Sequence, residues 1–385
     1  MLVIMKTNGR VRARKTIKIA CVALALISIF AFSFGCSEKK VVGAKYLGSF
    51  LSSDVYLYLA EEVPSSRYDE LEKTCAELIA EYERVFSVAN GNGELNAFNR
   101  VESGEKFEIS KRLDALFTLS RELYEKTDGA FDPTVYPLVD LYGFSYRFDG
   151  AYSPVYPFDR MRDGEVLPLP EQKFVSAFAS LADLSAIERT EEDGRVFLKK
   201  TLFVDVDGVK YQQQADMSSV AKGALADDLR AVIDGHSVKN YYLSLGTSSL
   251  YLGNNNGEPW GVQIVDPKSS ERLALCEIPL ESVSVSTSGT YEKCYFVGGR
   301  KIHHVIDAAT GESAKTDILS VAVVGENGAY CDGLSTALIA MGFDRAKEFI
   351  EKTSGYSFVF VLEDGRVFSD LAVKPINADY EFLNF

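Results

Sequence analysis

The sequence contains few residues of the kinds that usually build metal sites. Its 385 residues include three histidines and six cysteines, and no two cysteines are spaced as Cys-x-x-Cys. The cysteine spacings therefore match no zinc-binding pattern. Lys and Arg are also in the minority, with 41 against 55 Asp and Glu and a formal net charge of −14. Since nucleic-acid backbones are bound through Lys and Arg, this charge argues against a nucleic-acid partner.

The first 35 residues combine a basic segment with an apolar one. Six Lys and Arg residues occur before residue 19, the first acidic residue is Glu38, and residues 19–35 form an apolar run. This pattern is typical of a secretory signal peptide. Cys36 follows Gly35 directly, which resembles the cleavage site of bacterial lipoproteins, where the cysteine becomes the lipidated first residue. An uncleaved membrane anchor is the alternative interpretation.

These features predict how the chain is organised and where it works. We expect a lipoprotein-type signal peptide at residues 1–35, a tether at 36–45 and one folded domain at 46–385. The protein would then be extracytoplasmic and held at a membrane by a lipid on Cys36. Removing residues 1–35 takes away six basic side chains, which leaves 35 of the 41 basic residues against 55 acidic ones. A protein this acidic needs a metal ion or a few placed lysines to bind a polyanionic ligand.

Apolar periodicity and turn residues divide the remaining chain into helices and strands without any repeat or low-complexity region. The Gly298-Gly299-Arg300 turn predicts a hairpin inside a long β-rich stretch. A segment rich in Pro, Asp and Arg, residues 146–170, is predicted to be a surface loop. The mixture of elements predicts an α+β fold. Helices are expected to begin near Ser66 and Ser110 and to cover 171–182 and 224–233, with strands at 45–59, 196–204, 210–215 and between 241 and 306.

One short segment near the C-terminus carries oxygen ligands at helical spacing. Residues 331–336 read Cys-Asp-Gly-Leu-Ser-Thr and follow an apolar, strand-like run. Residues four apart share a helix face, so the Asp332 carboxylate and the Thr336 hydroxyl are expected to point the same way. Two hard oxygens beside a helix N-terminus suit Mg²⁺ and the phosphates that it carries. The alternative is that Asp332 caps the helix and Thr336 packs against a neighbour.

Two further segments contain residues that could bind phosphate or a metal ion, but their sequence patterns are less specific. Residues 216–223, Asp-Met-Ser-Ser-Val-Ala-Lys-Gly, lie where a strand leads into a helix. Backbone N–H groups there could bind phosphate with Lys222 as a point charge, or the segment could be an ordinary helix start. His303 and His304 form a pair, but adjacent strand residues face opposite sides and cannot readily share one metal ion.

The order of these motifs resembles that of the ApbE family of FAD:protein FMN transferases, from about residue 45 to the C-terminus. The resemblance implies an α+β fold of the ApbE type, related to the T-fold, with mixed sheets and packed helices. The segments that carry it are GELNAFN (93–99, more loosely), GAFDPTVYPLVDLYGF (129–144), DMSSVAKGALADDL (216–229), STSGTY (286–291), HVIDAATGES (304–313) and CDGLSTALIAMG (331–342).

Site roles follow from the resemblance position by position. It implies that the Ser219 carbonyl, Asp332 and Thr336 bind Mg²⁺, and that His304 and Asp332 assist proton transfer. The residues that it implies in binding FAD, which is the substrate, are Leu47, Ala130, Phe131, Asp132, Asp216, Lys222 and Val305.

The resemblance also implies the reaction. FMN would pass from FAD to a Thr or Ser hydroxyl of an extracytoplasmic or membrane electron-transfer flavoprotein, with release of AMP, while Mg²⁺ stabilises charge on the diphosphate. Two alternatives differ in class. One is a metal-dependent FAD pyrophosphatase, in which water replaces the protein hydroxyl, and the other is a flavin-binding lipoprotein without catalysis.

Some positions depart from the family pattern. Leu47 stands where Met is common, and Ala89 stands where an aromatic residue often covers the flavin. Residues 247–249, Thr-Ser-Ser, replace the usual Gly-Gly-Asp, and Cys331 replaces Ala before the metal-binding Asp332. These changes predict weaker packing of the isoalloxazine ring and weaker FAD binding.

Overall fold

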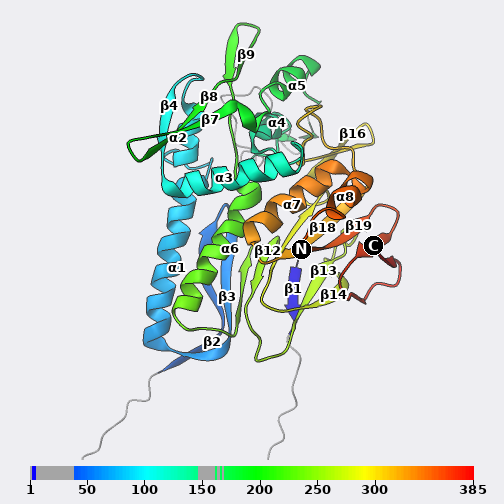
Figure 1. Ribbon diagram of the computed structural model, residues 1–385. Coiled ribbons are helices and arrows are strands. Elements are labelled where there is room, and N and C mark those ends of the chain that lie inside the picture. The colour runs from blue at the N-terminus through cyan, green and yellow to red at the C-terminus, as the bar shows by residue number, and fades with distance from the viewer. Residues whose placement is uncertain (1, 6–38, 146–160, 163–164, 167–168) are drawn as a thin grey trace, which may run out of the picture.

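The computed structural model describes residues 2–5, 39–145, 161–162, 165–166 and 169–385, and its ribbon is drawn in Figure 1. Within these residues, nine strands form the central sheet. At one edge β20 and β22 pair in parallel, whereas the other neighbours pair antiparallel. In spatial order the strands are β2 (Lys40–Phe50), β3 (Ser53–Pro64), β11 (Tyr241–Leu245), β12 (Ser249–Leu252), β15 (Ser284–Gly289), β18 (Ile318–Gly325), β19 (Tyr356–Leu362), β20 (Arg366–Ser369) and β22 (Glu381–Asn384).

The strand β18 shows that the sheet carries a hydrophobic layer on each face. All eight of its residues are buried, and successive side chains of a strand point to opposite faces. Val321 and Val323 belong to the cluster on one face, whereas Ala322 and Val324 belong to the cluster on the other. A central strand covered on both faces therefore has a continuous apolar sequence instead of an alternating one.

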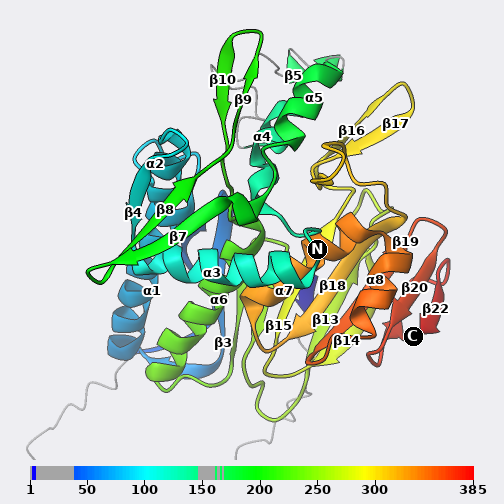
Figure 2. The ribbon, with the colours of Figure 1, turned by 45° about the horizontal axis from the view of Figure 1, so that its top comes forward.

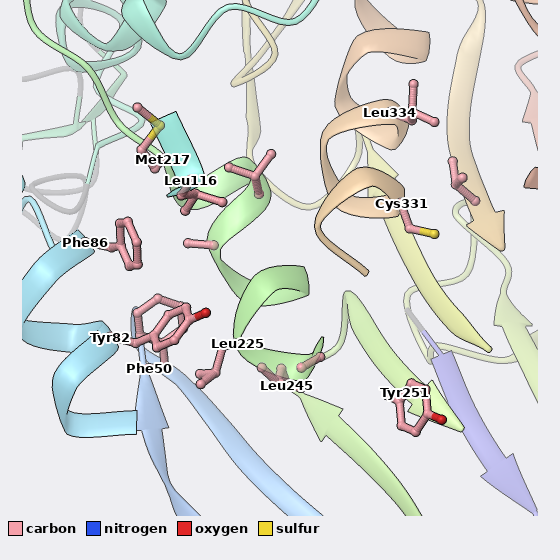
Figure 3. Close-up of a cluster of buried hydrophobic side chains, with 14 of the residues drawn as sticks. Phe50, Tyr82, Phe86, Leu116, Met217, Leu225, Leu245, Tyr251, Cys331 and Leu334 are labelled. Atoms are coloured by element: carbon pink, nitrogen blue, oxygen red, sulfur yellow. The ribbon is translucent and has the colours of Figure 1, made fainter. Parts of the chain in front are cut away.

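Helices cover the first face of the sheet (Figure 1). In α1 the buried residues recur three or four positions apart, which places them on one stripe facing the sheet. Figure 3 shows part of the resulting core, where Tyr82 and Phe86 of α1 lie beside Phe50 of β2 and Leu225 of α6. The helices of this layer are α1 (Ser65–Phe86), α6 (Ser218–Gly235), α7 (Gly328–Met341) and α8 (Phe343–Ile350), and α3 (Lys111–Lys126) lies across α6 and α7.

A smaller sheet covers the second face. Trp260, Val262 and Ile264 of this sheet pack against Val285 and Val359 of the central sheet. Its strands, in spatial order, are β1 (Leu2–Met5), β13 (Trp260–Val265), β14 (Ala274–Leu280) and β21 (Lys374–Pro375).

The remaining elements gather above the helical layer in Figure 2. A third hydrophobic cluster joins residues of α4 and α5 to Tyr295 and Ile302 of the hairpin β16–β17. The elements are α2 (Glu94–Arg100), β4 (Lys106–Ile109), η1 (Pro133–Val135), α4 (Tyr136–Leu141), β5 (Met161–Arg162), β6 (Glu165–Val166), α5 (Gln172–Ala179), η3 (Leu184–Ala186), β7 (Ile187–Glu192), β8 (Arg195–Lys200), β9 (Phe203–Val206), β10 (Val209–Gln212), β16 (Cys294–Val297) and β17 (Arg300–His303).

The α+β class expected from the sequence is confirmed, and the predicted hairpin forms at Gly298 and Gly299, both with positive φ. The predicted tether at 36–45 is too long at its C-terminal end. Strand β2 begins at Lys40, because Lys40 and Val41 already pair with the end of β3. Residues 2–5 of the expected signal peptide form β1, while Cys36 and most of the predicted loop at 146–170 lie outside the described residues. No helix in the described part of the chain combines the length and hydropathy needed to cross a membrane.

Candidate functional site

Helices α6 and α7 touch backbone to backbone where Gly223 meets Gly328. A Cβ atom built on Gly223 would lie 2.0 Å from the Gly328 carbonyl oxygen, which no side chain can tolerate. One turn further along α6, Asp227 accepts hydrogen bonds from the backbone N–H groups of Gly328 at 2.9 Å and Ala329 at 3.1 Å. The glycines therefore let α6 provide a carboxylate to the start of α7, where free N–H groups need acceptors.

Asp332 lies one turn inside α7 and is not its cap. Asn327 holds the N-cap position and accepts from the Tyr330 N–H at 2.8 Å. The buried Asp332 carboxylate instead turns toward α6 and the sheet. Its two oxygens accept from the Gly223 N–H at 3.0 Å and from the Ser249 hydroxyl at 3.2 Å. The capping interpretation of Asp332 is therefore wrong.

The electrostatic setting of Asp332 combines burial with positive charge. Burial raises the pKa of Asp332, while Lys222 and the hydrogen-bond donors Gly223 and Ser249 oppose that shift. An ionised carboxylate in such a place needs compensating charge or donors. The site supplies both from α6 and β12.

Thr336, one turn after Asp332, is half-buried and faces the neighbouring strand β15. The Ser288 hydroxyl lies 3.4 Å from the Thr336 hydroxyl and 2.7 Å from the Ser335 hydroxyl. Asp332 and Thr336 thus both contact strands at the centre of the sheet, as their spacing on one helix face predicts. Their oxygens lie within a group of serine and threonine hydroxyls.

The first turn of α6 brings another carboxylate and a lysine to the same place. The Asp216 carboxylate accepts from the Ser218 N–H at 2.8 Å, and Lys222 reaches back to the Ser218 carbonyl at 3.4 Å. Desolvation raises the pKa of the Asp216 carboxylate, and both Lys293 and Lys222 lower it. Ser219 lies one turn before Gly223, whose N–H binds Asp332, so the predicted metal ligands on α6 and α7 are close in space.

The segment 129–132 leads into the short helix η1 and lies near the start of α6. The Asp132 carboxylate accepts from the Thr134 N–H at 2.8 Å and from the Thr134 hydroxyl at 2.6 Å, and burial raises its pKa to about 6. The Pro133 carbonyl accepts from the Asp216 N–H at 3.0 Å, which ties the segment to α6. Phe131, however, is only 1% exposed and packs in the main core, so a flavin could reach its backbone but not its ring.

His304 follows strand β17 and is half-buried. Its backbone N–H donates to the Lys293 carbonyl at 3.2 Å. Burial lowers the pKa of His304 to about 3, and the positive charges of Lys293 and Lys222 act in the same direction. The imidazole is therefore neutral at physiological pH and can accept a proton. His303 has separate surroundings, with its ring bound to the Ala314 carbonyl at 3.0 Å.

The remaining positions implied in flavin binding are only partly accessible. Leu47 and Val305 are each 5% exposed and pack in the main core, whereas Ala130 is half-buried. Ala89 is exposed, so the position expected to carry an aromatic cover is open to solvent. Ser249, in the altered segment 247–249, binds Asp332 and so affects the predicted metal ligand directly.

The residues at the α6–α7 crossing fit a magnesium ion by the chemistry of their donors. A carboxylate from Asp332, a hydroxyl from Thr336 and the Ser219 carbonyl are hard oxygen ligands of the kind that Mg²⁺ prefers, with its other positions left for water or phosphate. Among the described residues, no cluster of three or more His, Cys, Asp or Glu side chains could hold a metal.

Sequence reasoning assigned no site role to Lys293, Ser249, Ser288 or Asp227. Asp227 and Ser288 lie inside the segments 216–229 and 286–291, and Ser249 lies in the altered segment 247–249, but no fixed spacing in the sequence connects these residues to their partners. Lys293 lies outside every recognised segment and follows residues 286–291 by two positions.

Comparisons with known proteins agree with this geometry. Residues 47–360 match the ApbE family. The FAD:protein FMN transferase of Klebsiella pneumoniae (strain 342) is 28% identical over 337 residues, which are 86% of this chain and 87% of that protein. The FAD:protein FMN transferase of Escherichia coli (strain K12) is 24% identical over 363 residues, 91% and 95% of the two chains.

Solved structures share the fold. The flavin transferase ApbE from Vibrio cholerae is 22% identical with a TM-score of 0.65, over 89% of this chain and 98% of that one. The apo form of Pseudomonas stutzeri flavinyl transferase ApbE is 21% identical with a TM-score of 0.67, over 88% and 96%. Since the family match spans most of the sequence and includes every site segment described above, the chain belongs to the ApbE family.

Proposed function

We propose that this enzyme transfers FMN from FAD to a Thr or Ser hydroxyl of an acceptor flavoprotein and releases AMP. The observation that carries the proposal is that Asp216, Lys222 and Asp332 gather where α6 begins and meets α7, while the charge of Lys222 also acts on His304. These groups come from three separate segments of a chain whose family contains FAD:protein FMN transferases. They provide a place for a diphosphate, its counter-charge and a neutral base.

The start of α6 suits the diphosphate of FAD. Backbone N–H groups of a helix's first turn attract anions, and Lys222 adds a positive charge one turn inside the helix. Asp216 fixes the first turn through its bond to the Ser218 N–H. The Lys222 ammonium, now 3.4 Å from the Ser218 carbonyl, needs only a rotamer change to reach a ligand at the helix start.

A magnesium ion would be held by Asp332, Thr336 and the Ser219 carbonyl. When bound, it supplies positive charge to the diphosphate, which lowers the energy of the charge that develops as the phosphoanhydride breaks. The Gly223 N–H and the Ser249 hydroxyl hold the Asp332 carboxylate in position for this task. Oriented ligands of this kind need less reorganisation on binding.

The transfer forms one bond and breaks another. The acceptor hydroxyl oxygen bonds to the phosphorus of the FMN half, the bond from that phosphorus to the bridging oxygen breaks, and AMP leaves with the bridging oxygen. The hydroxyl proton must be removed, and the neutral imidazole of His304 can accept it. No covalent enzyme intermediate is required, so the protein works by positioning and electrostatics.

Incubating the protein with FAD, Mg²⁺ and a flavoprotein domain that contains a modifiable Thr tests the proposal. We expect covalent FMN on that Thr, detected by in-gel fluorescence and mass spectrometry, together with one equivalent of AMP. Free FMN with AMP would instead identify a pyrophosphatase. Neither product, despite bound FAD, would identify a flavin-binding protein without catalysis. The Thr→Ala acceptor is the matched control.

We also propose that the mature protein is an extracytoplasmic lipoprotein anchored through Cys36. The support is the basic and apolar N-terminal sequence with cysteine after Gly35. Strand β2 begins at Lys40, so the anchor would lie close to the folded domain. Radiolabelled palmitate should be incorporated by the wild type and not by Cys36→Ser. Equal labelling of the two would contradict the assignment.

A further inference from the structure

Lys293 is an exposed lysine in the short connection between β15 and the hairpin β16–β17. Its carbonyl accepts from the His304 N–H at 3.2 Å, so the hairpin holds Lys293 and His304 side by side. The pairing of Cys294 with His303 fixes the same register. The position of Lys293 relative to the proposed base is therefore set by backbone bonds.

The positive charge of Lys293 also acts on a residue at the start of α6. It lowers the pKa of Asp216, at the start of that helix, and it also lowers the pKa of His304. Lys222 of α6 lowers the pKa of the same two groups. Coulombic interactions weaken with distance, so the charges of both lysines act on the same carboxylate and the same imidazole from nearby.

A count of formal charges shows why one lysine is insufficient there. The FAD diphosphate carries two negative charges, and Asp216 and Asp332 add one each. A magnesium ion and Lys222 together supply three positive charges, which leaves a negative excess in a protein whose net charge is already −14. Lys293 supplies the missing positive charge. This matters because an unbalanced charge in a partly desolvated site is costly.

We propose that Lys293 is a second phosphate-binding lysine, which clamps the FAD diphosphate opposite Lys222. The inference rests on the proposed function for the identity of the ligand. Lys293 approaches from the hairpin that also carries His304, whereas Lys222 approaches from α6. The diphosphate is thereby held between the two elements that must align the base with the reacting phosphorus.

Other lysines nearby do not share this placement. Lys301 lies in the same hairpin, but its ammonium group donates to the Thr290 hydroxyl at 2.9 Å. Its charge lowers the pKa of His303. Lys301→Gln therefore removes one positive charge from the same region, as Lys293→Gln does, but it leaves the proposed phosphate ligand in place. It is the matched control.

The test measures equilibrium binding of FAD and of riboflavin by flavin fluorescence, in the presence of Mg²⁺, for the full protein. Lys293→Gln should weaken FAD binding about tenfold or more, as expected for loss of a charge-assisted hydrogen bond to phosphate. Riboflavin binding, which involves no phosphate, should stay unchanged. Lys293→Arg should retain FAD affinity within about threefold because the positive charge is kept. Lys301→Gln should bind both ligands as the wild type does.

Two results would overturn the inference. One is unchanged FAD affinity in Lys293→Gln, and the other is an equal loss of FAD and riboflavin affinity, which would make Lys293 structural. Thermal unfolding of each variant shows whether it folds. If Lys293→Gln is unstable, Lys293→Arg becomes the deciding variant, and its failure to bind FAD with nearly wild-type affinity also overturns the proposal. Wild-type protein that binds FAD in this Lys293-dependent way without forming covalent FMN would refute the proposed transfer alone.

Discussion

Replacing Gly223 by alanine should separate α6 from α7 and disturb the site that their contact builds. The added Cβ would lie 2.0 Å from the Gly328 carbonyl oxygen, whereas real Cβ contacts stay above 3.0 Å. The helices must therefore move apart by roughly 1 Å, because the obstructing atom is backbone and cannot rotate away. That movement stretches the bonds from Asp227 to Gly328 and Ala329, and from the Gly223 N–H to Asp332.

The expected magnitude follows from these contacts. Overpacking of a dense interior costs roughly 1–3 kcal/mol, and each weakened hydrogen bond adds about 0.5–1.5 kcal/mol. With three such bonds, we expect Gly223→Ala to lose about 2.5–7.5 kcal/mol of unfolding free energy. Urea denaturation followed by circular dichroism measures this loss, and FAD binding with Mg²⁺ measures the displacement of Asp332.

Two other glycines give matched comparisons. Gly235, on the same helix, has no atom within 4 Å of an added Cβ, so Gly235→Ala should change stability by less than about 1 kcal/mol. An alanine at Gly333 would meet the Leu123 side chain at 2.4 Å, which can shift, so an intermediate loss is expected. A Gly223→Ala protein as stable as Gly235→Ala would refute the reasoning.

Three further changes test the proposed metal site, the start of α7 and the buried imidazole of His303. Asp332→Asn should fold but lose the dependence of FAD binding on Mg²⁺, measured by magnesium titration, because the only carboxylate of the proposed metal site is neutralised; retained dependence would contradict the assignment. Asp227→Ala should lower the unfolding free energy by about 1–2 kcal/mol in urea denaturation, since two N–H groups at the start of α7 lose their acceptor. The folded-state pKa of His303 is lowered by burial to about 4, below its unfolded value near 6.5. The unfolded chain therefore binds the additional proton, and stability should fall as pH decreases from about 6.5 to 4, by about 1.4 kcal/mol per pH unit. His303→Gln should lack this component, and equal pH slopes in the two proteins would count against it.

The structure shows where the residues lie that depart from the family pattern at the expected flavin site. Ala89 is exposed, which leaves one side of a flavin without the aromatic cover expected at that position. Ser249, by contrast, binds the Asp332 carboxylate at 3.2 Å. The altered segment 247–249 thus affects the proposed metal ligand more directly than the ring. Weaker FAD binding stays a prediction.

Several features of this protein were determined by the sequence itself. The spacing of Asp332 and Thr336 placed both on one face of α7, and the Gly298-Gly299 turn specified a hairpin. The order of motifs identified the family. Such features depend on neighbouring residues along one element, where helical or strand geometry fixes which side chains share a face.

Contacts between elements were decided only by the tertiary structure. The cap of α7 comes from Asn327 and from Asp227 of α6, so Asp332 is left for another role. The charge of Lys293 lowers the pKa of Asp216, although the two residues belong to distant parts of the sequence. Phe131, expected at the flavin, is in the core. Which residues of distant segments meet depends on how complete helices and sheets pack, and that information is spread over the whole core and not contained in any single motif.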